Sequence, residues 1–143
     1  TVNTSMAAIK GMKKNNWGRI INMASVSVKE PLSYLALSNT IRSAVTSWGK
    51  TLSIESGKHN VTVNNILTGF FNTERLKQLN SEKAKKFNVN TDEVFDKMSK
   101  MVPLKRIGEP EEFGYLVAFL SSDFADYING ANIPIDGGLL KSM

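Results

Sequence analysis

The sequence predicts an α/β protein built on a parallel β-sheet. Helical and strand-like segments alternate along the first half of the chain, and a polar stretch, a clear helix and a short strand complete it. This alternation is typical of parallel strands joined by crossover helices. Three strands make only half of a doubly wound sheet. We therefore expect a three-layer α/β/α arrangement that either associates extensively or forms the C-terminal half of a longer domain.

The first helix and strand are predicted from hydrophobic spacing. A helix ending near Lys14 is indicated by apolar residues three and four positions apart, namely Val2, Met6, Ile9 and Met12. Residues 18–25, GRIINMAS, then form a short strand. Their near-continuous apolar character favours a central strand covered on both faces.

The second helix and strand follow directly. Residues 38–58 carry a helical stripe made of Ile41, Ala44, Val45, Trp48 and Leu52. Residues 61–69, VTVNNILTG, are β-branched and apolar, which is typical of a buried strand. The helix between the two strands is therefore the expected crossover.

A charged insertion occupies residues 73–102. It contains two weak helical patterns, at 73–87 and 91–101. A polar insertion directly after the carboxyl end of a strand is where α/β enzymes keep lids and substrate loops. We expect a single domain over residues 1–143 in which this insertion forms a substrate lid.

The C-terminal helix and strand are the clearest elements. Pro110 suits the first turn of a helix over 109–123, and Glu111 and Glu112 complement its N-terminus. Residues 131–138, ANIPIDGG, alternate apolar and polar positions. Because Pro134 has no backbone N–H to donate, this strand should lie at a sheet edge.

Composition excludes several classes of function. The chain has no cysteine and a single histidine, His59, so a disulfide, a thiolate metal site or a histidine cluster has no ligands, and we expect no metal. The net charge of +5 is spread along helix faces rather than gathered as for nucleic acid. No leader-like segment and no apolar run of roughly 20 residues is visible. A cytoplasmic protein is expected.

Three stretches resemble the C-terminal half of the short-chain dehydrogenase/reductase family. They are GRIINMASVS, VNNILTGFFNT and RIGEPEEFGYLVAFLSSDFADYINGANIPIDGG. The likeness extends over nearly the whole chain and is strongest to the 3-oxoacyl-[acyl-carrier-protein] reductases. It implies a partial, Rossmann-type NAD(P)-binding domain over residues 1–143, the C-terminal half of a doubly wound parallel sheet. It also implies an oxidoreductase that transfers hydride to or from a carbonyl or alcohol.

The resemblance places Ser25 where family members carry a serine that hydrogen-bonds the substrate oxygen. A hydroxyl aimed at charge that develops on this oxygen lowers the reaction barrier. The alternative is a serine at a strand end that satisfies a turn.

The family's Tyr-x-x-x-Lys pair is changed in this sequence to Ser38 and Arg42. Four-residue spacing puts both side chains on one helix face. In the family the lysine lowers the pKa of the tyrosine, ordinarily about 10, and holds the nicotinamide ribose. A serine hydroxyl is too weak an acid to replace a phenol unaided. Arg42 keeps the positive charge and could reach the ribose, although its fork geometry differs from that of lysine.

Tyr34 is a candidate substitute phenol. It precedes Ser38 by four residues, so an early helix start would stack it one turn above Ser38. It would then lie about 12 Å along the helix from Arg42, too far for Arg42 to lower its pKa directly. The other interpretation, favoured by the nearby Pro31, is a loop or interface aromatic.

Residues 68–73, TGFFNT, resemble the family's Pro-Gly-x-x-x-Thr loop, which packs on the nicotinamide. The resemblance gives five candidate cofactor-binding residues: Arg42, Thr68, Gly69, Phe71 and Thr73. Gly69 allows close approach of the backbone to a ligand. Thr73 has two compatible roles, a hydrogen bond to the carboxamide and an N-cap for the helix that follows. Thr68 stands where the family has proline.

Most of a dinucleotide site is missing from these residues. They contain no Gly-rich strand-to-helix turn for a pyrophosphate and no residue that would choose between NAD and NADP. We expect NAD or NADP as the cofactor but no tight binding by the 143-residue chain alone. Two functions stay open: an NAD(P)-dependent oxidoreductase, or a weakened family member or fragment that serves as a binding or structural subunit.

The expected partners follow from the apolar helix stripes and the resemblance. The helices that carry Met6 and Ile9, and Ile41, Val45 and Trp48, match elements that pair across two-fold axes in the family. A homodimer or homotetramer is therefore expected. The expected substrate is a small carbonyl or alcohol compound, with no nucleic acid or membrane partner.

Overall fold

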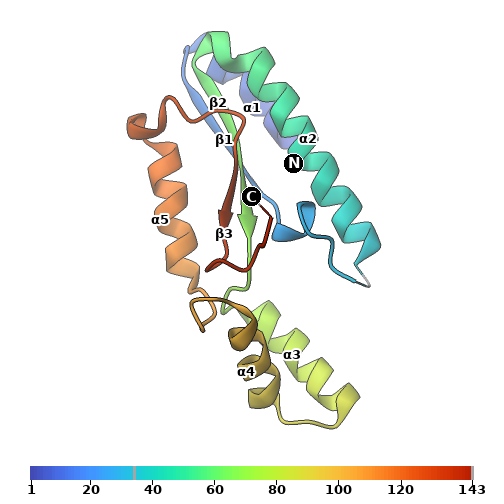
Figure 1. Cartoon of the computed structure of the whole chain (residues 1–143). Coiled ribbons are helices and arrows are strands. Elements are labelled where there is room, and N and C mark those ends of the chain that lie inside the picture. The colour runs from blue at the N-terminus through green and yellow to red at the C-terminus, as the bar shows by residue number, and fades with distance from the viewer. Residues whose placement is uncertain (34, 143) are drawn as a thin grey trace.

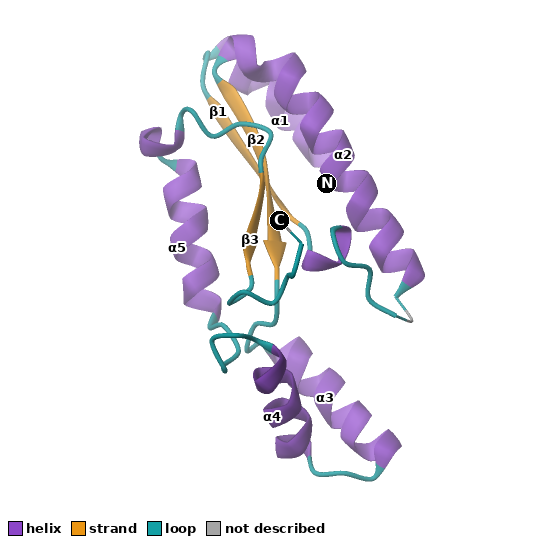
Figure 2. Ribbon diagram, in the orientation of Figure 1, coloured by secondary structure: helices purple, strands orange, loops and turns teal. Residues whose placement is uncertain are grey.

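The computed structural model describes residues 1–33 and 35–142 and has the predicted α/β architecture. A parallel sheet has α1 and α2 on one face and α5 on the other (Figures 1 and 2). α3 and α4 pack side by side beyond the carboxyl end of β2 (Figure 1). The helices are α1 Val2–Lys14, α2 Ala36–Ser56, α3 Glu74–Phe87, α4 Thr91–Met101 and α5 Pro110–Ser121, and the strands are β1 Gly18–Met23, β2 Val61–Thr68 and β3 Asn132–Ile135. One-turn 3₁₀ helices span Val26–Val28, Gly57–His59 and Asp123–Ala125.

The strand order β1-β2-β3 follows the sequence, and both pairings are parallel. β3 lies at an edge, as Pro134 predicted. The expectation that residues 18–25 form a central strand is wrong for this sheet, because β1 occupies the other edge and ends at Met23, which is 63% exposed. β2 is the central strand, and all of its residues except the last are buried. No strand within residues 1–33 and 35–142 pairs with the outer side of β1.

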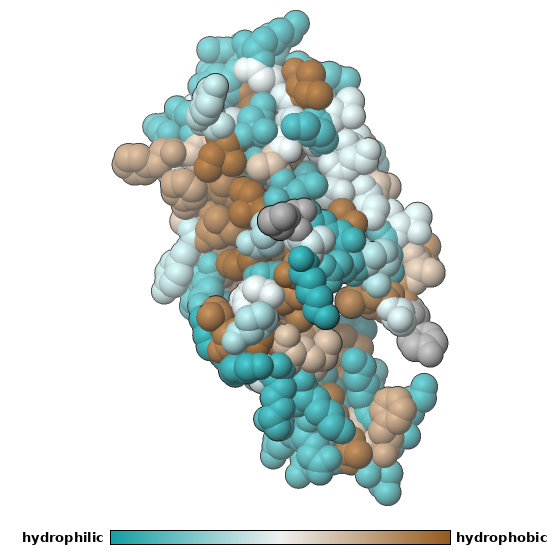
Figure 3. Space-filling model, in the orientation of Figure 1, coloured by the Kyte–Doolittle hydropathy of each residue, from teal (hydrophilic) through white to brown (hydrophobic). Residues whose placement is uncertain are grey.

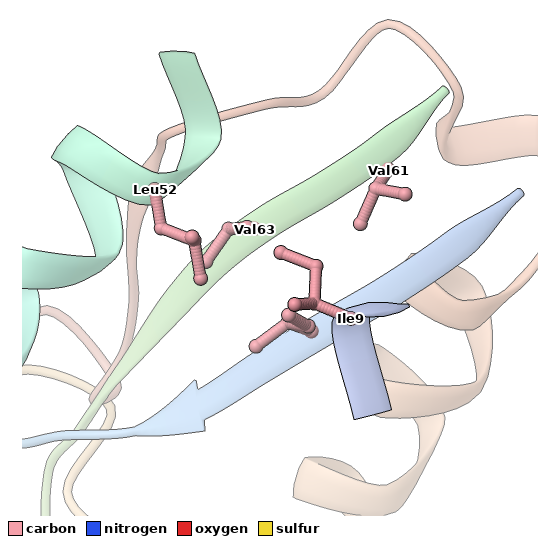
Figure 4. Packing of buried hydrophobic residues seen from close by; sticks show 5 residues of the cluster. Ile9, Leu52, Val61 and Val63 are labelled. Atoms are coloured by element: carbon pink, nitrogen blue, oxygen red, sulfur yellow. The ribbon is translucent and has the colours of Figure 1, made fainter. Parts of the chain in front are cut away.

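The core on the α1–α2 face is a compact aliphatic cluster. Figure 4 shows Ile9 of α1 and Leu52 of α2 pointing toward Val61 and Val63 of β2. Trp48 packs against this cluster from α2. Two residues of the predicted interface stripes, Ile9 and Trp48, therefore belong to the core of this chain. Met6 and Ile41 of the same stripes are 47% and 55% exposed.

The core on the α5 face is formed by β2, α5 and the residues that follow α5. Its fully buried centre is Ile66 of β2 with Leu120 of α5, and the predicted helix face formed by Phe113, Leu116 and Val117 packs around it. Figure 3 shows hydrophobic side chains gathered over α5, whereas the α3–α4 pair is mostly hydrophilic. None of the helices in the described part of the chain is long and apolar enough to cross a membrane.

The start of α5 is fixed by charge. Pro110 occupies the first turn, as predicted, and Glu112 accepts a hydrogen bond of 2.8 Å from the backbone N–H of Glu109. Arg106 donates to both carboxylate oxygens of Glu112, at 2.6 and 2.7 Å. These hydrogen bonds, first those from Arg106, lower the pKa of Glu112 from its ordinary 4.5 to about 2.

A row of asparagines crosses the sheet beneath α2. Asn22, Asn65 and Asn132 are register partners on the three strands. Asn22 donates to the Asn65 side chain at 2.9 Å, and Asn65 donates to the Asn132 side chain at 2.8 Å. A Cβ added at Gly49 of α2 would lie 2.8 Å from Asn65 Oδ1. The glycine therefore allows the helix to pass close over the amides.

Candidate functional site

The candidate site lies at the carboxyl ends of β1 and β2, which is where ligands bind in parallel α/β sheets. An open pocket of about 460 Å³ lies there, bounded by the β2–α3 loop, the first turns of α3 and the start of α5. All five predicted cofactor-binding residues line it: Arg42, Thr68, Gly69, Phe71 and Thr73. The structure therefore brings together residues from two separate segments of the sequence around one hollow.

Ser38 and Arg42 lie on one face of α2, as their spacing predicted. Arg42 Nε donates to Ser38 Oγ at 3.3 Å, and Arg42 Nη1 donates to the backbone oxygen of Ala24 at 2.8 Å. The second bond attaches the guanidinium to the end of β1. Ser38, Arg42 and the exposed Met23 line a second open hollow of about 450 Å³, together with Thr1 and the apolar side chains of Leu37, Ile41 and Val45. Arg42 is shared by the two hollows.

Ser25 lines neither hollow, although it follows Ala24 directly in the chain. Its Oγ accepts a hydrogen bond of 3.1 Å from the backbone N–H of Ser27 and caps the short 3₁₀ helix Val26–Val28. The alternative role as a serine that satisfies a turn is therefore present in the structure. The same hydroxyl keeps its own proton, so a substrate contact stays a prediction.

Thr68, in the place of the family's proline, joins the two strand ends. Its Oγ1 donates to the backbone oxygen of Ala24 at 3.0 Å. Ala24 O therefore accepts from both Thr68 and Arg42, which ties β1, β2 and α2 together at one point. A proline at this position would have no side-chain hydroxyl for this contact.

Gly69 is required by packing as well as lining the pocket. A Cβ at this position would lie 2.7 Å from Asp136 Cα, at the end of β3. The Gly69 N–H donates to the Ile135 oxygen at 3.0 Å. The missing side chain thus allows the loop to approach β3, and the approach to a ligand stays a prediction. Phe71 packs edge-to-face on Phe113, with ring centroids 6.1 Å apart.

Thr73 caps α3, which is one of its two predicted roles. Its Oγ1 accepts from the Leu76 N–H at 3.3 Å. The side chain is exposed at the pocket and can also donate its hydroxyl proton to a ligand. Tyr34, the candidate substitute phenol, lies outside the described residues. α2 begins at Ala36.

Sequence reasoning missed Arg75 and the apolar wall of the pocket. Arg75 lies in the first turn of α3, and Met23, Leu76, Leu79 and Phe113 contribute apolar surface. The signal for Arg75 was its position two residues after the predicted N-cap, because the first turn of a helix after a strand faces the carboxyl end of the sheet. Arg42 and Arg75 are the charged side chains on the described wall of this pocket.

The residues present fit the nicotinamide end of a dinucleotide and not the whole of it. The pocket volume falls in the range of small-molecule sites, which is roughly 300–1,000 Å³. It offers apolar walls, hydroxyl groups at Thr68 and Thr73, and two cations for a ribose or phosphate. A Gly-rich pyrophosphate turn does not occur in the 143 residues. Within the described residues, no group of three or more acidic, histidine or cysteine side chains could hold a metal ion.

Fold and site together define the C-terminal half of a Rossmann-type α/β domain. L-sorbose reductase from Gluconobacter frateurii, solved with NADPH and L-sorbose, superposes with a TM-score of 0.93 at 30% identity, over 99% of this chain and 54% of that one. The family model described as enoyl-(acyl carrier protein) reductase matches residues 1–140. The chain therefore belongs to the short-chain dehydrogenase/reductase family.

Two curated relatives show how much of a family member's length this chain covers. NADPH-dependent reductase BacG of Bacillus subtilis is 36% identical over 92% of this chain and 51% of its own length. The 3-oxoacyl-[acyl-carrier-protein] reductase FabG of Pseudomonas aeruginosa is 30% identical over 96% of this chain and 51% of its own length. The chain thus spans about half the length of the curated relatives it matches.

Proposed function

We propose that this chain is the C-terminal half of an NAD(P)-dependent oxidoreductase that transfers hydride between a nicotinamide and a carbonyl or alcohol compound. One observation carries the proposal. All five residues predicted for the cofactor, from α2 and from the β2–α3 loop, line a single pocket at the carboxyl end of the parallel sheet. Family membership supports the same reaction class.

We assign a separate role to each residue of the proposed site. A bound nicotinamide supplies the hydride. Thr73 would donate its hydroxyl proton to the carboxamide while its oxygen stays the cap of α3. Arg42 would contact the ribose from its fixed position beside Ala24. Arg75, at the N-terminal turn of α3, would attract the cofactor's phosphates. Ser25 would orient the substrate.

We propose NADPH as the cofactor and a ketone of modest size as the substrate. BacG is named as NADPH-dependent, and the L-sorbose reductase structure contains NADPH. A further relative, from Cupriavidus necator, is an acetoacetyl-CoA reductase. The apolar wall of Leu76, Leu79 and Phe113 suits an acyl or carbon chain better than a sugar. The α3–α4 segment would then act as the lid of this site.

The proposal is tested by comparing the 143-residue chain with the protein expressed from its complete coding sequence. We expect the complete protein to bind NADPH and to oxidise it with a member of a ketone panel made of acetoacetyl-CoA, another 3-oxoacyl thioester and L-sorbose. We expect no tight NADPH binding to the 143-residue chain in a fluorescence titration. Arg75→Ala should weaken NADPH binding about tenfold, whereas Lys85→Ala, on the exposed far end of α3, should not. Tight NADPH binding by the 143-residue chain would contradict the expectation that most of the dinucleotide site is missing from these residues.

A weakened, non-catalytic subunit is the second candidate. The observation that favours it is the replacement of both members of the Tyr-x-x-x-Lys pair by Ser38 and Arg42. The double variant Ser38→Tyr with Arg42→Lys distinguishes the two functions in the complete protein. An increase in ketone reduction indicates a weakened site. A wild type that turns over a ketone, with loss of turnover in the double variant, excludes the weakened subunit.

We also propose a homodimer or homotetramer and a cytoplasmic location. The assembly is supported by apolar side chains that remain exposed on the helices predicted to pair, among them Met6 of α1 and Ile41 of α2. Sedimentation of the complete protein tests the assembly, and Ile41→Glu should shift it toward the monomer.

A further inference from the structure

We propose that Ser38, polarised by Arg42, donates the hydrogen bond to the substrate's carbonyl oxygen and relays a solvent proton to it. This inference rests on the oxidoreductase function proposed above. It assigns the proton donor that the loss of the tyrosine at this position leaves open.

The pair is held rigidly. Arg42 Nη1 is bonded to Ala24 O at 2.8 Å, and Thr68 Oγ1 is bonded to the same oxygen at 3.0 Å. The guanidinium is thus attached to the ends of both β1 and β2, while its own helix carries Ser38. A donor held in place before the reaction needs no reorganisation when charge appears on the substrate.

The direction of the hydrogen bond leaves the serine proton available for a ligand. A guanidinium N–H can only donate, so Ser38 Oγ is the acceptor in the 3.3 Å contact with Arg42 Nε. The hydroxyl hydrogen rotates about the Cβ–Oγ bond and is free to point at a third group. A hydroxyl that accepts from a cation is polarised and becomes a stronger donor.

The pair also borders the predicted cofactor pocket through Arg42. Arg42 borders the pocket that holds the predicted cofactor residues, and Ser38 and Arg42 together border the adjoining hollow of about 450 Å³. Met23 forms a wall of both hollows. Ser38 is therefore joined to the cofactor pocket through Arg42, which lines that pocket and donates to Ser38 Oγ at 3.3 Å.

The step balances with water as the proton source. Hydride brings two electrons to the carbonyl carbon, the π pair of the C=O bond moves to oxygen, and an alkoxide forms. Ser38 transfers its hydroxyl proton to this alkoxide, and Ser38 Oγ takes a proton from a solvent water. The resulting hydroxide is neutralised by bulk solvent. Arg42 stays charged throughout because an arginine does not lose its proton in proteins.

This mechanism has a distinct pH signature. A phenol paired with a lysine titrates near the working pH, so its rate changes as the phenol ionises. Serine and arginine do not titrate between about pH 6 and 9. The charged side chains on the described walls of the two hollows are Arg42 and Arg75. Thr1 also lines the second hollow, so the pH profile is measured on the complete protein rather than on the 143-residue chain. We therefore expect kcat/KM for ketone reduction to be flat over this range.

The experiment uses the complete protein, NADPH and whichever ketone of the panel is reduced fastest. Ser38→Ala should lower kcat about 10²-fold, with the Kd for NADPH, measured by fluorescence, changed less than about twofold. Ser38→Thr keeps a hydroxyl and should restore activity to within about tenfold of wild type. Ser47→Ala, an exposed serine farther along α2, is the matched control and should leave kcat unchanged.

Two results would overturn the inference while leaving the proposed function intact. One is a Ser38→Ala variant that keeps the wild-type kcat. The other is a kcat/KM that rises or falls with one ionisation between pH 6 and 9, together with loss of activity in Tyr34→Phe, which would assign the proton to Tyr34. A wild type that binds NADPH but reduces no ketone of the panel instead overturns the proposed function, and the role of Ser38 with it.

Discussion

The two sides of β2 differ in how many contacts within this chain hold the neighbouring segments in place. On the β3 side, Asn64 donates to Ile128 O at 2.7 Å and accepts from the Ala131 N–H at 3.0 Å. Asn129 joins the same loop to the Val63 N–H at 2.9 Å and to Ser53 O at 3.0 Å. On the β1 side, the strand ends at an exposed Met23, and its outer edge has no strand partner in the described part of the chain.

This difference indicates that the β3 side of β2 mainly stabilises the fold, whereas the β1 side carries the candidate site. On the β3 side, side-chain amides bond the backbone of the loop before β3, so that side is fixed by contacts within this chain. On the β1 side, few residues hold the site, chiefly Arg42 and Thr68 through Ala24 O. Substitutions on the first side should therefore lower stability more, and substitutions on the second side should lower it less while those at Arg42 and Thr68 change binding or turnover.

The largest effect is expected from Asn64→Ala. The substitution leaves Ile128 O and the Ala131 N–H without their partner and opens a cavity at a residue that is 1% exposed. We expect the free energy of unfolding to fall by about 2–4 kcal/mol in urea titrations.

The matched variant on the other side is Asn22→Ala. Asn22 is 5% exposed and donates one hydrogen bond, to Asn65. Asn22→Ala should lower the free energy of unfolding by roughly half as much as Asn64→Ala, because one buried hydrogen bond is lost instead of two. Equal losses for Asn64→Ala and Asn22→Ala would contradict the proposed asymmetry.

An intermediate effect is expected at Thr73, which lies between the two sides. Thr73→Ala removes the N-cap of α3 and should cost about 1 kcal/mol of stability, while Thr73→Ser should cost less. If Thr73 also contacts the carboxamide, Thr73→Ala in the complete protein should weaken NADPH binding beyond what the loss of stability explains. NADPH titration of folded protein separates the two roles, and unchanged affinity would leave Thr73 with the cap alone.

The smallest effect is a change in acid stability at Glu112. Its pKa is about 2 in the folded chain and ordinarily 4.5, so ionised Glu112 stabilises the fold above about pH 4.5. That contribution is lost as the pH falls from 4.5 toward 2. Glu112→Gln should therefore make the thermal midpoint less dependent on pH in this window. Glu111→Gln, at an exposed position with no ion pair in the described structure, is the control. A steeper pH dependence in Glu112→Gln would show that the assigned ion pair is wrong.

The sequence predicted the elements well because their signals are local. Helical spacing, Pro110 at a helix start and Pro134 at a sheet edge each depend on a few neighbouring residues. The position of β1 was misjudged because its apolar composition predicts burial. Composition does not show whether a second strand beside β1 lies within the described residues. Arg75 was missed because pocket walls depend on which turns of α3 face the sheet, which spacing alone does not specify. The five cofactor residues were found through the family resemblance and then shown to share one pocket.

The hydrogen bonds in the asparagine row beneath α2 form only when the strands pair in the observed register. A slip of one residue between β1 and β2 would turn the Asn65 amide toward the opposite face of the sheet from Asn22, and a slip of two would separate the two amides along the strands. Gly49 rests on this row, and Arg42 lies two helical turns before it on α2. The close approach of Gly49 to the Asn65 and Asn22 amides therefore links the strand register to how far α2 extends past the strand ends, and so to the position of Ser38 and Arg42.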